Sequence, residues 1–219
     1  MIDWTGYLPL ILQGAWVTAQ LTVYGCALAF AVAFAAGLGR LSRHGIVRAL
    51  ASVYIEFFRG TSIFVQLFWV YFVLPLFGLT LTPLEAGVLA LGLNVGAYAA
   101  EVVRGAILTV PKEQYEACTA LNLTRRQSLR HIVLPQAFVV MLPTFGNNAI
   151  ELLKGTAVVS LISLADLTFQ AQVVRAQTGS TAFPFLSILL IYFLFALLIS
   201  LATRGLERRL ARGLDGARA

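Results

Sequence analysis

The side chains of this sequence that could do chemistry are a few polar and charged residues set within long apolar stretches. Glu151 and Lys154 stand three residues apart, and Asn148, Glu151 and Gly155 follow the i, i+3, i+7 spacing of one helix face. The carboxylate of Glu151 and the ammonium group of Lys154 can contact a solute or neutralise each other. The apolar stretches contain no His, Asp or Glu set that could hold a metal and no pair of catalytic carboxylates. We therefore expect neither a catalytic residue nor a metal site.

A second polar helix face lies in the apolar stretch that follows residue 84. Asn94, Tyr98 and Glu101 are spaced i, i+4, i+7 and therefore share one side of a helix. The side chains of Asn94 and Tyr98 can contact a solute, or they can simply bond a neighbouring helix.

Two pairs of opposite charges occur at i, i+3 spacing near the ends of apolar stretches. They are Glu56 with Arg59 and Glu101 with Arg104. A charged side chain at the centre of a bilayer costs about 2.5–3.5 kcal/mol, so such residues need a partner or a wet cavity. We interpret both pairs as structural ion pairs, and an inner gate is the alternative.

The composition indicates the environment of these side chains. Hydrophobic residues make up 59% of the 219 residues and charged residues only 12%, against about 45–50% and about 25% in soluble proteins. The mean hydropathy is +0.83. A soluble fold cannot bury this much apolar surface, which excludes a secreted domain, a disordered chain and a free cytosolic enzyme. The sequence predicts an all-α protein embedded in a lipid bilayer.

Five apolar stretches are long enough to cross a bilayer, which takes about 20 helical residues. Pro143, Gly146 and Gly155 predict that the helix of the fourth stretch is broken. The five predicted spans lie near residues 18–38, 60–84, 84–108, 133–162 and 184–203.

The positive charges orient these spans. With five spans, 14 of the 16 Lys and Arg residues lie on or near one side, whereas four or six spans would scatter them over both faces. The positive-inside bias then places the N-terminus outside and the C-terminus in the cytoplasm. The net charge of +6 thus reflects membrane orientation and not nucleic-acid binding. The 14 residues are Arg40, Arg43, Arg48, Arg59, Arg104, Lys112, Arg125, Arg126, Arg130, Arg204, Arg208, Arg209, Arg212 and Arg218.

The basic segment 111–135, between the third and fourth spans, carries the signals of two short helices. The first is expected to begin near Lys112 and to stop near Asn122, because asparagine tolerates the left-handed conformation at a helix end. Thr124 and Gln127 form a capping-box pattern at the start of the second helix. The segment is therefore predicted to be a structured cytoplasmic element and not a simple connection.

The same segment resembles the EAA loop of the permeases of ABC importers. The family pattern is E-A-A, three residues, G, nine residues and I-x-L-P, and the spacing here fits it throughout. Two positions depart from the pattern, because Cys118 replaces the usual alanine and Asn122 the usual glycine. Asparagine is the best substitute for glycine at a left-handed position, so we expect the turn to survive. Pro135 is expected to break the helical pattern. The matching residues are Glu116, Ala117, Cys118, Asn122, Ile132, Leu134 and Pro135.

Other segments extend this resemblance to nearly the whole chain. Together they resemble the polar amino acid branch of type I ABC importers, also called the histidine/glutamine permease group. The resemblance implies that 1–219 is one transmembrane domain, a multi-pass permease subunit of the bacterial inner membrane that works by alternating access. The segments are 14–18, 56–61, 93–98 with Glu101 and Arg104, 146–148 and 152–154.

The resemblance also implies a set of partners. They are a second permease subunit, forming a homo- or heterodimer, two cytoplasmic ABC ATPases and an external solute-binding protein. The segment 111–135 would be the coupling element that sits in a groove of an ATPase. The sequence agrees, because it has no G-x-x-x-x-G-K-[ST] phosphate-binding loop. We therefore expect ATP and Mg²⁺ on the partner ATPases, no cofactor on this chain, and transport rather than enzymatic activity.

The residues of the fourth span bear on the solute. In relatives that move cationic amino acids, acids commonly occupy the positions of Asn148 and Gly155, and this chain has neither acid. Its carboxylate is Glu151 instead. We therefore expect a path that prefers a polar amino acid, or a small zwitterionic derivative, over arginine or lysine, and the resemblance favours solute contact for Asn94. The alternative is a self-contained secondary transporter, but such folds often show inverted repeats and none is visible here.

Overall fold

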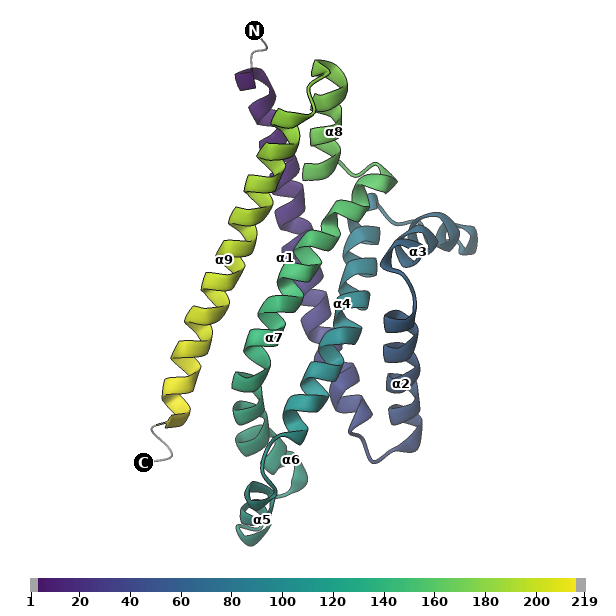
Figure 1. Cartoon of the computed structure of the whole chain (residues 1–219). Coiled ribbons are helices and arrows are strands. Elements are labelled where there is room, and N and C mark those ends of the chain that lie inside the picture. Colours follow the sequence, from purple (N-terminus) through teal and green to yellow (C-terminus); the bar gives the residue numbers. More distant parts are fainter. Residues whose placement is uncertain (1–3, 216–219) are drawn as a thin grey trace.

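The computed structural model describes residues 4–215, which contain helices and no strands (Figure 1). Arg218, one of the basic residues used to orient the spans, lies outside this range. The α-helices are α1 (Leu8–Arg40), α2 (Gly45–Gly60), α3 (Ile63–Phe68), α4 (Pro83–Leu108), α5 (Lys112–Ala120), α6 (Arg125–Ser128), α7 (Leu134–Gly155), α8 (Leu167–Thr178) and α9 (Ala182–Asp215). Short 3-10 or π-helical turns are η1 (Trp4–Tyr7), η2 (Trp69–Val73), η3 (Leu74–Phe77), η4 (Leu129–Val133) and η5 (Thr156–Ile162).

Four helical stretches between residues 4 and 215 are long and apolar enough to cross a membrane, and a bent pair of helices is a fifth candidate. The bent pair consists of Gly45–Gly60 and Ile63–Phe77, whose directions differ by 106°. The second span predicted near 60–84 therefore matches the second half of this bent pair, and its first half, Gly45–Gly60, lies before the predicted start. The other four stretches are Leu8–Arg40, Pro83–Leu108, Arg125–Ile162 and Ala182–Leu210.

A buried amide holds the bend between α2 and α3. Thr61 and Ser62 have extended backbone, with ψ of 152° and 134°, so a helix cannot continue through them. The Nε2 atom of Gln66 donates to the carbonyl oxygen of Phe58 (3.0 Å) and to Oγ1 of Thr61 (2.6 Å). The last carbonyl groups of a helix lack intrahelical donors. Gln66 supplies a donor to one of these carbonyls, that of Phe58, and so fixes the bend.

α1 and α4 form the centre of the bundle and pack through small residues (Figure 1). A Cβ atom on Gly37 would lie 2.7 Å from the backbone oxygen of Ala100. A Cβ atom on Gly92 would lie 2.7 Å from the side chain of Leu28. Helices in a membrane associate mainly through such close packing, since lipid tails are as apolar as the side chains. The close approach brings the polar ends of α1 and α4 within reach of each other.

α7 and the turns that flank it form one continuous helical stretch, Arg125–Ile162. The break predicted at Pro143 and Gly146 is wrong, because α7 runs through both residues. Gly146 allows close packing instead, since a Cβ atom there would lie 2.6 Å from Cγ2 of Thr203 in α9. Of the three residues, Gly155 alone marks a change of backbone, from α-helix to 3-10 helix.

Pro135 does not end the helical pattern either, contrary to expectation. In a regular α-helix a proline ring clashes with the carbonyl group four residues back. Here the π-helical turn η4 precedes the proline, and the N–H of Leu134 donates to the carbonyl of Leu129, five residues back. This wider turn accommodates the ring. The second part of the segment 111–135, from Arg125 on, therefore runs into α7 without interruption.

The two ends of the bundle carry different elements (Figure 1). α8 lies at the end where α1 begins, and its first backbone N–H, on Leu167, donates to Oγ1 of Thr18 in α1 (3.1 Å). α5 and α6 lie at the opposite end, where α9 also finishes (Figure 1). The segment 111–135 is thus far from α8 and on the same end of the molecule as the last described turn of the chain.

Candidate functional site

A cavity of about 370 Å³ lies between α3, α4 and α7 and collects five of the six residues predicted to line a solute path. Its volume is in the range of small-molecule sites, about 300–1,000 Å³. Asn148 is the exception, because it does not line the cavity, and its buried Nδ2 atom has no hydrogen-bond partner. The five residues are Asn94, Tyr98, Glu151, Lys154 and Gly155, and the wall is completed by Ile63, Leu91, Val95 and Leu152.

Glu151 and Lys154 are the two charged residues of this cavity. Both side chains are exposed in the single chain. Within the described residues no ion pair joins them, although they are three residues apart on α7. In this structure, therefore, the charges of Glu151 and Lys154 do not neutralise each other through an ion pair. A carboxylate and an ammonium group instead line one cavity, and each remains free to bind a group of opposite charge.

Asn94 is tied to the bend between α2 and α3. Its Nδ2 atom donates to the carbonyl oxygen of Phe58 (3.0 Å) and to Oε1 of Gln66 (3.1 Å). An amide nitrogen has two hydrogens, so both are used by these bonds. Asn94 thus joins α4 to the bent pair, and only its Oδ1 atom remains for a solute.

Tyr98 contacts the same bend through Arg59. Its hydroxyl donates to the carbonyl oxygen of Arg59 (3.4 Å), and the guanidinium carbon of Arg59 lies 5.3 Å from the centre of the tyrosine ring. This distance is within the range of cation–π interactions. The predicted ion pair of Arg59 with Glu56 is therefore wrong, because the arginine packs on a ring of α4 instead.

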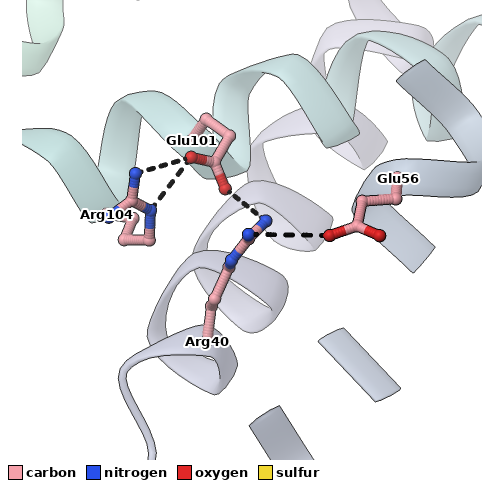
Figure 2. Close-up of polar contacts among 4 residues, drawn as sticks. All are labelled: Arg40, Glu56, Glu101 and Arg104. Atoms are coloured by element: carbon pink, nitrogen blue, oxygen red, sulfur yellow. Dashed lines mark hydrogen bonds and ion pairs between the residues drawn. The ribbon is translucent and has the colours of Figure 1, made fainter. Parts of the chain in front are cut away.

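Figure 2 shows the ion-pair cluster that replaces it. Glu101 of α4 accepts from Nη1 of Arg40 (2.8 Å) and from Nε of Arg104 (2.9 Å), so its i, i+3 pair with Arg104 is present. Arg40, the last residue of α1, also approaches Glu56 of α2 at 3.7 Å. One arginine thus joins three helices at the end of the bundle that carries α5 and α6.

The sequence does not predict a partner for Arg40, because spacing within one helix reveals only partners a few residues away and Glu101 is 61 residues away. The one available signal is its position as the first basic residue after a long uncharged stretch. Its side chain is 27% exposed and that of Glu101 is 21% exposed, whereas that of Glu56 is 71% exposed. The contact between Arg40 and Glu101 is therefore the more protected part of the cluster.

The turn after α5 shows how asparagine serves where the EAA pattern has glycine. Asn122 has a φ of +53°, in the left-handed region. The N–H of Leu123 donates to the carbonyl of Cys118 (3.0 Å), and that of Asn122 donates to the carbonyl of Thr119 (3.0 Å). These two bonds form a complete Schellman motif, the usual end of a helix at a left-handed residue. The prediction that the turn survives is confirmed.

The second predicted helix of the segment also begins as expected. Thr124 and Gln127 form the full capping box at the start of α6.

The residues that match the EAA pattern differ in exposure. Glu116 and Ala117 of α5 are exposed, whereas Cys118 is only 4% exposed. The replacement of alanine by cysteine therefore affects the inward packing of α5 and not its outer face. Ile132 and Leu134 are half-buried and Pro135 is exposed.

Asp166 is a buried polar residue that sequence reasoning missed. Its carboxylate accepts from the N–H groups of Thr168 (3.2 Å) and Phe169 (2.9 Å) and so caps α8. Burial raises the pKa of Asp166 to about 6, although these hydrogen bonds act in the opposite direction. An aspartate one residue before an apolar helix is a recognisable N-cap signal.

Metal ligands do not cluster in the described part of the chain. No group of three or more His, Cys, Asp or Glu residues there could hold a metal ion, and Cys26 and Cys118 are both free thiols.

Proteins similar to this chain are membrane transport components. A family model described as "Binding-protein-dependent transport system inner membrane component" matches residues 27–212. The probable amino-acid ABC transporter permease protein y4tF of Sinorhizobium fredii (strain NBRC 101917 / NGR234) is 47% identical over 217 residues, covering 96% of this chain and 91% of that protein. The L-cystine transport system permease protein TcyB of Bacillus subtilis (strain 168) is 37% identical, covering 93% of this chain and 88% of that protein. A crystal structure of an amino acid ABC transporter with histidines matches with a TM-score of 0.86 and 35% identity, covering 95% of this chain and 99% of that chain.

Proposed function

The chain belongs to the family of binding-protein-dependent transport system inner membrane components, and from this premise we propose that it is the permease subunit of an ATP-driven importer for a polar amino acid or a small zwitterionic amino-acid derivative. The observation that carries the solute class is the cavity in which Glu151 and Lys154 lie without pairing with each other. Membership of this family favours the importer over a self-contained secondary transporter. The chain acts as a transport subunit in a bacterial inner membrane and not as an enzyme, and 1–219 forms one transmembrane domain.

The charges of the cavity suit a zwitterion. The ammonium group of Lys154 binds the solute carboxylate, and the carboxylate of Glu151 binds the solute ammonium group. Charge-assisted hydrogen bonds of this kind are about twice as strong as those between neutral groups. A solute with a net positive charge would bring a cationic group without a carboxylate of its own into a cavity that has no second carboxylate, and an unpaired charge removed from water is costly.

The solutes named for two relatives agree with this charge balance. L-cystine carries no net charge at neutral pH, and most histidine is neutral there because the imidazole pKa is about 6.5.

Asn94 and Tyr98 contribute differently to the same path. Their bonds to the bend between α2 and α3 position one wall of the cavity, and Oδ1 of Asn94 is left for the solute.

The segment 111–135 transmits work from another protein. The exposed face of α5, with Glu116 and Ala117, sits in a groove of a cytoplasmic ABC ATPase, and two such ATPases hold the ATP and Mg²⁺. A second permease subunit completes the path, as a homo- or heterodimer, and an external binding protein delivers the solute. This arrangement puts α5, α6 and the C-terminus in the cytoplasm and the N-terminus outside. It is supported by the basic residues gathered at that end and by the continuous helix from Arg125 to Ile162, which links α6, directly after the turn that follows α5, to the cavity.

Uptake by the assembled importer in proteoliposomes tests the proposal. Glu151→Gln and Lys154→Gln each remove one charge from the cavity, and we expect the KM for a zwitterionic amino acid to rise about tenfold or more. Arg208→Gln, which removes a charge from the exposed surface of α9, is the matched control and should leave KM unchanged. Strong saturable uptake of arginine, or an unchanged KM in both cavity variants, would contradict the solute class. Uptake without ATP or any ATPase would contradict the importer itself.

A further inference from the structure

A second cavity, of about 770 Å³, lies beside α5 and α6. It opens between the turn joining α1 to α2 and the segment 111–135. Four basic side chains line it, and its lining contains no Asp or Glu. The basic residues are Arg43 and His44 from the turn and Arg125 and Arg126 from the start of α6.

The positive charges of this cavity have no acidic partner among the side chains that the structure describes, those of residues 6–210. Within that range none of the three arginines takes part in an ion pair, in contrast to Arg40 close by. Arg125 uses one Nη2 hydrogen bond, to the carbonyl oxygen of Leu41 (3.5 Å), which holds the guanidinium at the cavity edge. A cluster of positive charges that no described acidic side chain neutralises favours an anionic ligand.

Apart from the polar side chains of Ser42, Tyr115, Thr119 and Ser128, the rest of the wall is apolar, and much of it comes from the ends of the membrane-crossing helices. Leu38 lies in the last turns of α1, Ile107 and Leu108 end α4, and Leu129 begins the stretch that leads into α7. Leu108 is 60% exposed and Ile46, two residues after His44, is 79% exposed, so the surface that leads away from the basic residues is apolar. The cavity therefore combines a basic rim with an apolar wall.

We propose that this cavity binds the phosphate headgroup of an anionic phospholipid, with the acyl chains along its apolar wall. The arginines sit where α1 and α4 end, which is the depth of lipid headgroups for helices that cross the bilayer. Basic pockets between transmembrane helices suit such headgroups. An acidic peptide segment would match the rim but would gain nothing from exposed leucine and isoleucine beside it, and free phosphate would use only the rim. The proposal needs the membrane placement of the chain but not the identity of its solute.

Native mass spectrometry of the purified importer complex measures the retained lipid directly. The complex is exchanged into detergent that contains phosphatidylglycerol or, as the neutral probe, phosphatidylcholine. Arg43→Gln with Arg126→Gln removes two charges of the cavity, and Arg208→Gln with Arg209→Gln removes two exposed charges of α9 at the same end. We expect the first pair to weaken phosphatidylglycerol binding by about tenfold or more and the control pair to leave it unchanged. Arg43→Gln alone, outside the segment 111–135, should give a smaller loss in the same direction.

Three results would overturn the proposal. Equal phosphatidylglycerol retention in the cavity and control variants would show that the lipid binds elsewhere. Displacement of phosphatidylglycerol by millimolar inorganic phosphate, or equal retention of phosphatidylcholine, would assign the cavity to free phosphate or to nonspecific lipid. Loss of ATPase co-purification with unchanged lipid retention in Arg43→Gln would assign it to an acidic segment of the ATPase.

Discussion

The turn at Asn122 allows a sharp test of how the segment 111–135 keeps its shape. Asn122 holds a φ of +53°, and two hydrogen bonds across the turn depend on that conformation. A left-handed backbone costs most residues about 1–2 kcal/mol, whereas asparagine tolerates it and glycine adopts it freely. Asn122→Ala should therefore destabilise the turn by about 1–2 kcal/mol, and Asn122→Gly should keep or strengthen it.

The magnitude can be measured at two amides. The N–H groups of Leu123 and Asn122 donate to the carbonyls of Cys118 and Thr119. A local free energy lower by 1–2 kcal/mol raises the population of the open turn by a factor of about 5–30. Hydrogen–deuterium exchange at residues 122 and 123 should accelerate by that factor in Asn122→Ala. If α5 is the coupling element, solute uptake per ATP hydrolysed should fall in the same variant.

The control for this test is the glycine variant, which restores the residue of the EAA pattern at the same position. Exchange at residue 123 in Asn122→Gly should be as slow as in the parent protein or slower. Unchanged exchange in Asn122→Ala would refute the reasoning, because the turn would then not depend on the left-handed residue. Faster exchange with unchanged solute uptake per ATP hydrolysed would show that the proposed coupling does not depend on the conformation of this turn.

Three further predictions follow from the contacts described. Ala117→Trp places a large ring on the exposed face of α5 and should lower solute uptake more than ATP hydrolysis, measured together in proteoliposomes; equal loss of both, or loss of neither, would argue against docking there. Glu101→Gln should lower the thermal unfolding temperature of the purified complex, because two arginines lose the carboxylate they share, whereas Glu56→Gln at an exposed 3.7 Å contact should change it little. Since burial raises the pKa of Asp166 to about 6, above the ordinary value of about 3.9 for an aspartate, the carboxyl binds its proton more tightly in the folded state. Stability should therefore fall as the pH rises from about 4 to about 6, and Asp166→Asn should flatten that dependence in thermal melts; an equal slope in both proteins would contradict this assignment.

Short-range features of this protein could be predicted from the sequence. The membrane class follows from composition, since 59% hydrophobic residues leave no soluble alternative. The caps at Thr124 and the turn at Asn122 follow from residues only a few positions apart, because capping bonds close within one helical turn. The cavity residues on α4 and α7 were also found, since i, i+3 and i, i+4 spacing places side chains on one helix face whatever the helix packs against.

The tertiary structure decided which partners the polar side chains take. Arg40 and Glu101 are 61 residues apart, and they meet only because small residues let α1 and α4 approach closely. Arg59 packs on Tyr98, and Asn94 bonds the end of α2, because α2 packs beside α4 and ends there in a bend of 106°. The sequence shows which charges and amides need partners. The free energy of burying them depends on the hydrogen bonds that the neighbouring helix provides, and only the tertiary structure determines which helix that is.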